Sequence, residues 1–174
     1  MREILFRGFT PDDRGKSEII VNGETIKGQW VQGSYWRLKK TTYCFKEDYE
    51  AHPDNTEHYI VFSEMTDWGL PNRQLKADVI PETVGQYTGL TDKNGKRIFE
   101  GDIVEATISQ NNYLRDRVDN YTHTYTVKYH TEYCYFYLAR EKNNLLFDGN
   151  WNYFLKSIEV IGNILDNGTD GAKN

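Results

Sequence analysis

The sequence contains few of the apolar residues that favour helices and almost none that crosslink a chain. Its 174 residues include two cysteines, four prolines and only 18 alanine, leucine and methionine residues in total. Valine, isoleucine and threonine number 36 and the aromatic residues 25, so side chains that suit pleated strands outnumber helix formers. The length excludes a large multidomain enzyme. The composition therefore predicts a mainly β protein of one or two small domains.

Long apolar stretches and export signals are also missing. No run approaches the roughly 18 apolar residues of a membrane helix, and the mean hydropathy is -0.75. The first residues lack the long apolar stretch and the small-residue cleavage pattern of a signal peptide. Cys44 and Cys134 both lie in aromatic-rich segments, so we expect reduced core residues, with a disulfide as the alternative. We expect a soluble cytoplasmic protein without a membrane partner.

Positive charge is not in excess. The chain has 21 basic and 26 acidic residues, which gives a net charge of -5. A surface for nucleic acid would have to be a local patch that works against the overall field. Basic residues gather at two places, and solubilising charges on a hairpin and an edge strand would produce the same pattern. The residues of this possible basic patch are Lys93, Lys96, Arg97, Arg37 and Lys39.

Short strands separated by turn signals account for most of the chain. Asn22-Gly23 and Asn94-Gly95 are typical of type I′ hairpin turns, in which both central residues have positive φ. Gly33 indicates a bend or bulge, and the side chain of Asp102 is expected to accept backbone N–H groups in a tight turn with Gly101. Polar residues predict a loop at 46–57 and a mobile insertion at 110–120. Strands are expected at 4–9, 18–21, 24–27, 29–38, 41–45, 59–62, 125–129, 133–138 and 158–165.

The spacing of these signals favours an antiparallel barrel or sandwich. We predict an N-terminal β region with long polar loops over residues 1–78 and a small SH3-like barrel over residues 79–165. The two regions can also form one two-lobed domain with a shared core. Residues 166–174 are rich in Gly, Asp and Asn and are predicted to form a flexible tail.

The stretch PETVGQYTGLTDKNGKRIFEGDIV at residues 81–104 is the most distinctive part of the sequence. Together with residues 1–8, 28–34 and 158–164, and in the same order, it resembles the YopX family of phage and prophage proteins. The resemblance implies a small, mostly β, cytoplasmic protein encoded by a phage or an integrated element, without an assigned activity. It transfers no catalytic residue. The chain departs from the compact family pattern at 39–76 and 110–120.

No group of residues predicts catalysis or a cofactor. His130 with Cys134 does not match a zinc spacing, and Glu100 with Asp102 lies at a turn, where a structural role is favoured over acid–base chemistry. Residues 85–89 are glycine-bounded but lack the lysine of a phosphate-binding loop. We therefore expect no enzyme activity, no cofactor and no metal. The remaining local cluster, equally without a zinc spacing, is His52, Asp54, Glu57 and His58.

Tyrosines in two predicted strands offer a possible interaction surface. If 125–129 pairs with 133–137 across a three-residue loop, all five tyrosines share one face. Either this face covers the core, or it is exposed and binds a protein partner or a second copy of the chain. The leading hypothesis is a non-enzymatic phage accessory protein that binds protein, and the alternative is a nucleic-acid-binding small β-barrel. The tyrosines are Tyr125, Tyr129, Tyr133, Tyr135 and Tyr137.

Overall fold

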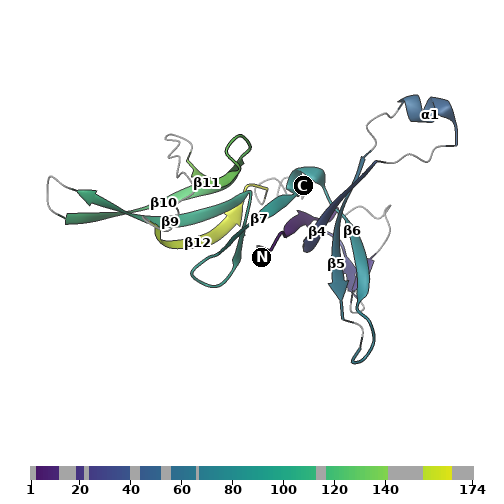
Figure 1. Cartoon of the computed structure of the whole chain (residues 1–174), viewed down its shortest axis with the longest axis horizontal. Helices are drawn as coiled ribbons and strands as arrows, with labels where there is room; N and C mark the ends of the chain where they lie inside the picture. The colour runs from purple at the N-terminus through teal and green to yellow at the C-terminus, as the bar shows by residue number, and fades with distance from the viewer. Residues whose placement is uncertain are drawn as a thin grey trace, which may run out of the picture. The chain divides into compact units, whose positions relative to one another are not determined.

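Most of the described residues form antiparallel strands, which confirms the predicted mainly β class. The structure is a computed structural model (Figure 1) that describes residues 3–11, 19–21, 24–39, 44–51, 56–65, 67–112, 117–140 and 155–165. The predicted tail, 166–174, lies outside these residues. The elements are β1 (Phe6–Phe9), β2 (Ile19–Val21), β3 (Glu24–Ile26), β4 (Trp30–Lys39), α1 (Lys46–Ala51), β5 (Thr56–Glu64), β6 (Arg73–Asp78), η1 (Pro81–Thr83), β7 (Gly85–Thr91), β8 (Arg97–Phe99), β9 (Asp102–Asn112), β10 (Arg117–His130), β11 (Tyr135–Ala139) and β12 (Leu155–Asn163).

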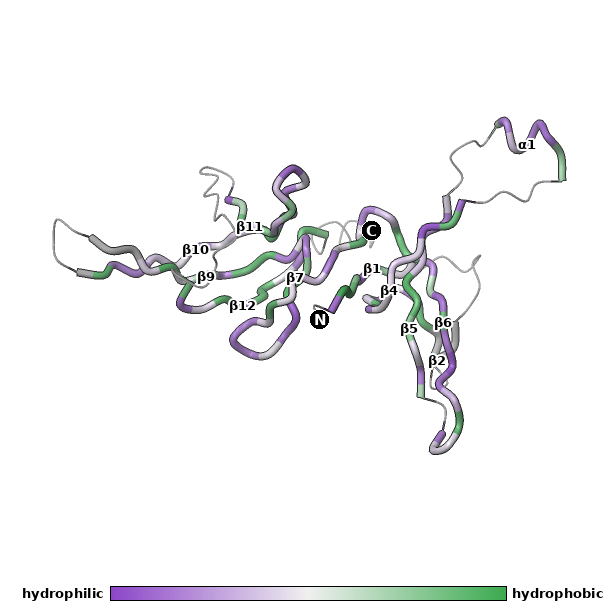
Figure 2. The backbone as a smooth tube through the Cα atoms, viewed as in Figure 1, coloured by the Kyte–Doolittle hydropathy of each residue, from purple (hydrophilic) through white to green (hydrophobic). Residues whose placement is uncertain are grey.

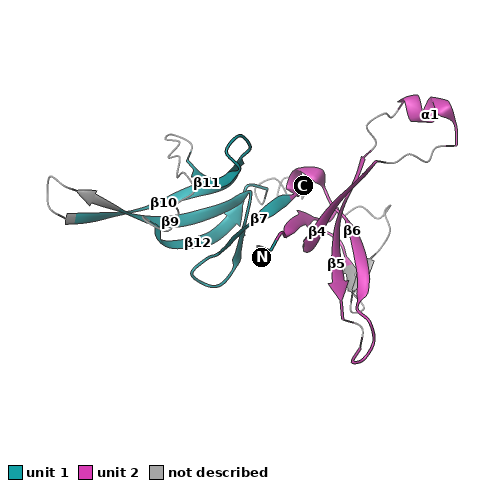
Figure 3. Cartoon of the chain, in the orientation of Figure 1, with its two compact units in different colours: residues 1–3, 85–174 teal, residues 4–84 magenta. Residues whose placement is uncertain are grey.

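The chain divides into two compact units (Figure 3). Unit 2 is the continuous segment Ile4–Val84, whereas unit 1 combines Met1–Glu3 with Gly85–Asn174. In unit 1 an ion pair between Arg97 and Glu3, 3.5 Å apart, joins the N-terminal piece to β8. Each unit has its own cluster of buried hydrophobic residues. The two units are therefore described separately.

Unit 2 contains a sheet with strand order β6–β5–β4–β1 and a separate β2–β3 hairpin. β4 is long enough to change partners, because it pairs with β1 up to Gly33 and with β5 from Ser34 onward. Gly33, where a bend or bulge was predicted, lies inside β4 at the point where the pairing changes from β1 to β5. Gly33 allows a close approach, as a Cβ there would lie 2.1 Å from the carbonyl oxygen of Val61. The buried residues of this core are Val31, Ile60, Ala77 and Val79.

A side chain at Gly33 should therefore destabilise unit 2. Gly33→Ala forces β4 and β5 apart, and overpacking of this kind costs about 1–3 kcal/mol. Urea unfolding followed by the fluorescence of Trp30 and Trp36, which flank the site on β4, measures the loss. Ser34→Ala, at the exposed next position, is the matched control and should change stability by less than about 0.5 kcal/mol. Equal unfolding midpoints for the two variants would contradict the close approach.

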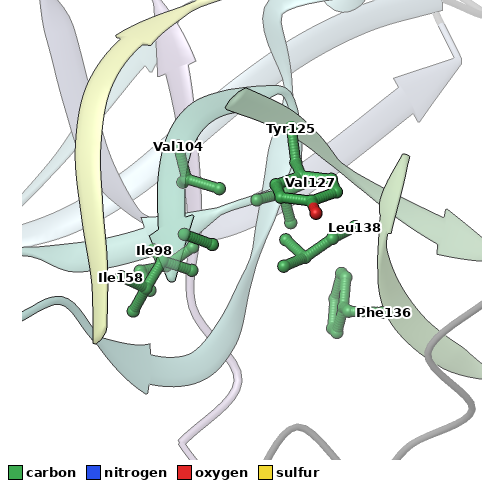
Figure 4. Packing of buried hydrophobic residues seen from close by; sticks show 8 residues of the cluster. Ile98, Val104, Tyr125, Val127, Phe136, Leu138 and Ile158 are labelled. Carbon is green, nitrogen blue, oxygen red and sulfur yellow. The ribbon is translucent and has the colours of Figure 1, made fainter. Parts of the chain in front are cut away.

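Unit 1 contains an antiparallel sheet with strand order β11–β10–β9–β12 and the hairpin β7–β8. Its core lies on one face of the sheet, where Ile98 of β8 packs near Ile158 of β12 and Leu138 near Val127 (Figure 4). The predicted SH3-like barrel is wrong, because closing a barrel requires the edge strands to meet. Within the residues that the structure describes, β11 and β12 remain separate edges of an open sheet.

Three predicted loops or strands are also corrected. Residues 46–57 include the helix α1 and the start of β5, and residues 110–120 include paired ends of β9 and β10. Cys44 and Phe45 form a bend where a strand was predicted, while 41–43 lie outside the described residues. β2 and β3 pair as expected, with Val21 opposite Glu24. The turn at Asn22-Gly23 lies outside the described residues.

The hydrophilic turn between β7 and β8 (Figure 2) is organised by an acidic side chain. Gly95 has φ +81°, but Asn94 does not have positive φ, so the predicted type I′ turn is wrong. The N–H of Asp92 donates to the carbonyl of Lys96 (2.8 Å) and the N–H of Gly95 donates to the carbonyl of Asp92 (3.0 Å). This is a three-residue hairpin loop closed by a left-handed glycine.

The turn at Gly101-Asp102 follows the prediction. Gly101 has φ +83°, and the N–H of Phe99 donates to the buried carboxylate of Asp102 over 2.8 Å. The chain thus reverses between β8 and β9 without leaving the N–H of Phe99 unsatisfied. The local chemistry of the Asp side chain is sufficient to specify this turn.

Asp92 makes the stability of unit 1 depend on pH. Burial favours its neutral form, but the N–H groups of Val160, Lys96 and Asn94 donate to the carboxylate and together lower its pKa. A lowered pKa contributes stability above the unfolded value of about 3.9, and this contribution is lost as pH falls through the folded value.

We therefore expect Asp92→Asn to be less stable than the wild type at pH 7, and the difference to shrink below about pH 4. Urea unfolding at a series of pH values, followed by circular dichroism, measures this difference. Lys96→Ala leaves the backbone N–H in place and removes only the charge of Lys96, the smallest of the contributions to the lowered pKa, so this control should have a pH dependence close to that of the wild type. A difference between Asp92→Asn and the wild type that stays constant from pH 7 to about pH 3 would contradict the linkage.

Candidate binding surface

The register between β10 and β11 decides which tyrosines can be exposed. His130 lies opposite Tyr135 and Tyr129 opposite Phe136, whereas the predicted pairing placed Tyr129 opposite Tyr133. The prediction is therefore wrong by three residues. Because side chains alternate along a strand, an odd shift moves every side chain of one strand to the other face.

The cause of this shift is the length of the turn. Four residues, 131–134, connect the two strands instead of three. Cys134 closes the turn with φ +54°, in the left-handed region that residues with a side chain seldom adopt. Its thiol lies 3.6 Å from the carbonyl oxygen of Thr131 and donates to it. A left-handed cysteine carries no sequence signal comparable to Asn-Gly, so the longer turn is difficult to predict.

Two of the five tyrosines belong to the core face. Tyr125 is 2% exposed within the core cluster of unit 1, and burial raises the pKa of its hydroxyl. Tyr129 is half-buried and packs on Phe136, with ring centres 5.0 Å apart. Both predicted alternatives, a common core face and a common exposed face for all five tyrosines, are therefore wrong.

The other aromatic residues of this region gather around His130. The ring of His130 lies 4.9 Å from the ring of Tyr133, 5.5 Å from that of Tyr135 and 6.0 Å from that of Tyr137, measured between centres. His130 and Tyr135 are stacked at 26°, and Tyr133 stacks on Tyr135 at the same angle. We call His130, Tyr133, Tyr135 and Tyr137 the aromatic cluster. His130 was not among the predicted site residues, because the predicted register placed it in the loop.

The aromatic cluster is accessible and carries little charge. Tyr133 is 68% exposed, and Tyr135 and Tyr137 are half-buried. The Nδ1 atom of His130 is buried and has no hydrogen-bond partner in the structure. Lys128, which lies opposite Tyr137 in the strand register, is exposed, and Glu132 is exposed in the turn. Among the described residues on these strands and their turn, Lys128 and Glu132 thus contribute one charge of each sign beside the rings.

The residues of the possible basic patch are divided between the two units. Lys93 pairs with Glu159 over 2.5 Å, which raises the pKa of Lys93 and lowers that of Glu159. Arg97 pairs with Glu3 and lies 5.7 Å from the ring of Tyr87. Lys96 is exposed in the same turn of unit 1. The other two, Arg37 and Lys39, are exposed on β4 of unit 2.

The local cluster of acidic and histidine residues at 52–58 lies partly in the described residues, and there its side chains are hydrogen-bonded to tyrosines. His52 and Asp54 lie outside the described residues. The Tyr59 hydroxyl donates to Glu57 over 2.7 Å, and this bond, followed by burial and nearby carboxylates, raises the pKa of Tyr59 to about 12. His58 Nδ1 is hydrogen-bonded to the hydroxyl of Tyr35 over 2.5 Å. In the described residues, no group of three or more His, Cys, Asp or Glu side chains is placed to hold a metal ion.

The predicted pair of acidic residues at the β8–β9 turn has two different environments. Asp102 is almost fully buried and accepts the N–H of Phe99. Glu100 is half-buried, and desolvation raises its pKa although the N–H groups of Tyr129 and Gln86 favour its charged form. Both side chains thus bind backbone groups at the point where β7, β8 and β10 meet.

Both cysteines are free, and both are exposed, so their predicted place in the core is wrong. Cys134 lies in the β10–β11 turn, and Cys44 lies in the bend before α1. Aromatic neighbours suggested burial, but Phe45 beside Cys44 and Tyr133 beside Cys134 are themselves exposed.

Exposure predicts that both thiols react in the folded protein. Titration with Ellman's reagent should give two thiols per chain without denaturant, and the same number in denaturant. Cys134→Ser should give one thiol under both conditions and serves as the control. A native protein that reacts only after denaturation would contradict the exposed positions.

Comparison with known proteins places the chain in a family. The model of the YopX protein family matches residues 23–169, which is most of the chain. The chain belongs to the YopX family. The aromatic cluster of this YopX protein lies inside the matched range, as does all of unit 1 from β7 to β12.

The crystal structure of protein EF1440 from Enterococcus faecalis is similar, with 19% identity, 97% coverage of each chain and a TM-score of 0.41. No curated protein matches the chain. Among the helices of the described residues, none is long and apolar enough to span a membrane.

Proposed function

We propose that this YopX protein is a non-enzymatic accessory protein of a phage or prophage, and that it binds another protein through the aromatic cluster. The observation that carries the proposal is the exposed group of stacked rings at His130, Tyr133, Tyr135 and Tyr137. Membership of the YopX family supports the phage context.

The packing of the aromatic cluster suits binding in two ways. Its rings already contact one another, so a partner would immobilise few additional rotamers on association. Tyrosine offers a large apolar ring and a polar hydroxyl, and it is enriched at protein interfaces and at their energetic hot spots. Tyr133 at the turn is the most exposed ring and should contact the partner first.

The charges near the cluster favour protein over nucleic acid. Surfaces that bind single strands combine stacking rings with a positively charged groove. Around the aromatic cluster Lys128 is accompanied by Glu132, and the whole chain has a net charge of -5. Lys93 and Arg97, from the possible basic patch, are paired with carboxylates.

A capture experiment with matched variants tests this proposal. The wild type, Tyr133→Ala/Tyr135→Ala and the control Tyr49→Ala, an exposed tyrosine of α1, are each used as bait in lysate from phage-infected bacteria, with and without nuclease. We expect the double variant to recover at least about tenfold less of a partner protein, the effect of 1.4 kcal/mol, and the control to match the wild type.

Two outcomes would contradict the proposal. Equal recovery by the double variant and the wild type would exclude the aromatic cluster as the binding surface. Recovery that disappears after nuclease treatment would favour the nucleic-acid alternative. Circular dichroism of the double variant checks that unit 1 is folded, as expected for exposed side chains.

A further inference from the structure

Among the strands that the structure describes, none pairs with one edge of β10 along its first nine residues. β10 pairs with β9 from Arg117 to Thr126, but β11 pairs with it only from Thr126 onward. β12, described from Leu155, likewise pairs with β9 as far as Ile108. β9 and β10 therefore continue beyond their neighbours (Figure 1). We call residues 109–112 and 117–124 the arm; in the described part of the chain it has two strands only.

The arm lacks most of the features that usually protect an exposed edge. Edge strands avoid pairing with other chains by proline, charged side chains, bulges or short length. Residues 117–125 contain no proline and no lysine, their charged residues are Arg117 and Asp119, and the pairing with β9 has no register shift. Val118 is 55% and Tyr121 44% exposed, although both are strong strand formers. An isolated two-stranded ribbon is only marginally stable in water, so an added strand would stabilise the arm.

Strand geometry shows which backbone groups point to the open edge. The carbonyl of Val127 accepts the N–H of Gly101, immediately before β9, so the backbone groups of Val127 point toward β9. Along a regularly paired strand, the N–H and C=O groups of successive residues point alternately to one side and to the other. The backbone groups of the even-numbered residues of β10 therefore point away from β9, toward the open edge. The residues that present N–H and C=O groups to the open edge are Val118, Asn120, Thr122 and Thr124.

We propose that this edge binds the same edge of a second copy of the chain, antiparallel and about a twofold axis at Tyr121. Tyr121 then lies opposite its own counterpart, and Asn120 lies opposite Thr122 of the second copy. Val118 lies opposite Thr124 in the same way. In this register the residues that point to the edge meet one another and exchange hydrogen bonds, while the odd-numbered residues form the closer non-hydrogen-bonded pairs.

The side chains of the two copies are complementary in this register. Asp119 lies opposite His123 of the second copy, so no like charges meet among residues 118–124, and two exposed Tyr121 rings cover each other. Any other symmetric register shortens the overlap. The overlap also ends at Tyr125, immediately before Thr126, where β11 already occupies the edge. The register centred on Tyr121 therefore uses the whole open edge, residues 117–125.

The interface is small. One strand pair with few side chains buries less than the roughly 1,000 Å² of a stable interface. The structure therefore predicts a dimer that dissociates on dilution, with a dissociation constant in the micromolar range. This inference is independent of the aromatic cluster, because it uses only the arm.

Disulfide trapping tests the register directly. In a Cys44→Ser/Cys134→Ser background, Tyr121→Cys places two thiols across the axis, where the non-hydrogen-bonded Cα distance of about 4.5 Å fits a disulfide. Val118→Cys is the matched control, because Val118 faces Thr124 rather than itself. We expect Tyr121→Cys to form covalent dimers at least about tenfold faster than the control. Equal rates, or no crosslinking at Tyr121, would overturn the proposed register.

Light scattering over a range of concentrations tests the association without crosslinking. The wild-type mass should rise from 20.4 kDa toward twice that value. Thr122→Pro removes an N–H that points to the open edge and keeps the bonds to β9, so this variant should stay monomeric. Thr122→Val keeps the N–H and should dimerise.

The result that would overturn the proposal is a wild type that stays monomeric at about 100 μM, well above the dissociation range expected for so small an interface. That result would leave the edge to a strand of another protein. Dimerisation of Thr122→Pro equal to that of Thr122→Val would overturn it as well. Circular dichroism separates a monomeric, folded Thr122→Pro from an unfolded one, and a second edge variant, Asn120→Pro, keeps the test decisive if the first does not fold.

Discussion

The odd or even length of one turn determines both the core and the surface of unit 1. With four residues between β10 and β11, Tyr129 lies opposite Phe136 on the core side, and His130 lies opposite Tyr135 on the other side. A three-residue loop would exchange the faces of β11 and direct Phe136 and Leu138 out of the core. The left-handed conformation of Cys134, which costs on the order of 1 kcal/mol, is thus compensated by the burial of both side chains.

The sequence predicted the strand-rich fold and the chemistry of turns that are specified by adjacent residues. Asp102 binds the N–H of Phe99 three residues away, and this local contact was predicted. Asp92 binds the N–H groups of Asn94 and Lys96, but also that of Val160, 68 positions away. Because the carboxylate already holds the turn from one side, Asn94 does not need positive φ. A dipeptide preference cannot include such a contact.

The missed elements depend on tertiary pairing or on very weak local signals. β6 has the sequence RQLKAD, which favours a helix, and it is a strand because Leu75 and Ala77 pair with Phe62 and Ile60 of β5. α1 has six residues, none of them buried, and an i,i+4 ion pair between Lys46 and Glu50. In the candidate site, Tyr133, Tyr135 and Tyr137 were predicted and His130 was not, since its place depends on the turn length.

The division of the chain into units determines the order in which they can form during synthesis. All of unit 2, Ile4–Val84, leaves the ribosome before β7 and the rest of unit 1. Its ends are held together by its own contacts, because the N–H of Ile80 donates to the carbonyl of Phe9 and the N–H of Phe9 donates to the Thr83 hydroxyl. Unit 2 can therefore complete its fold as a nascent chain, whereas the ion pair of Glu3 can form only after Arg97 has been translated.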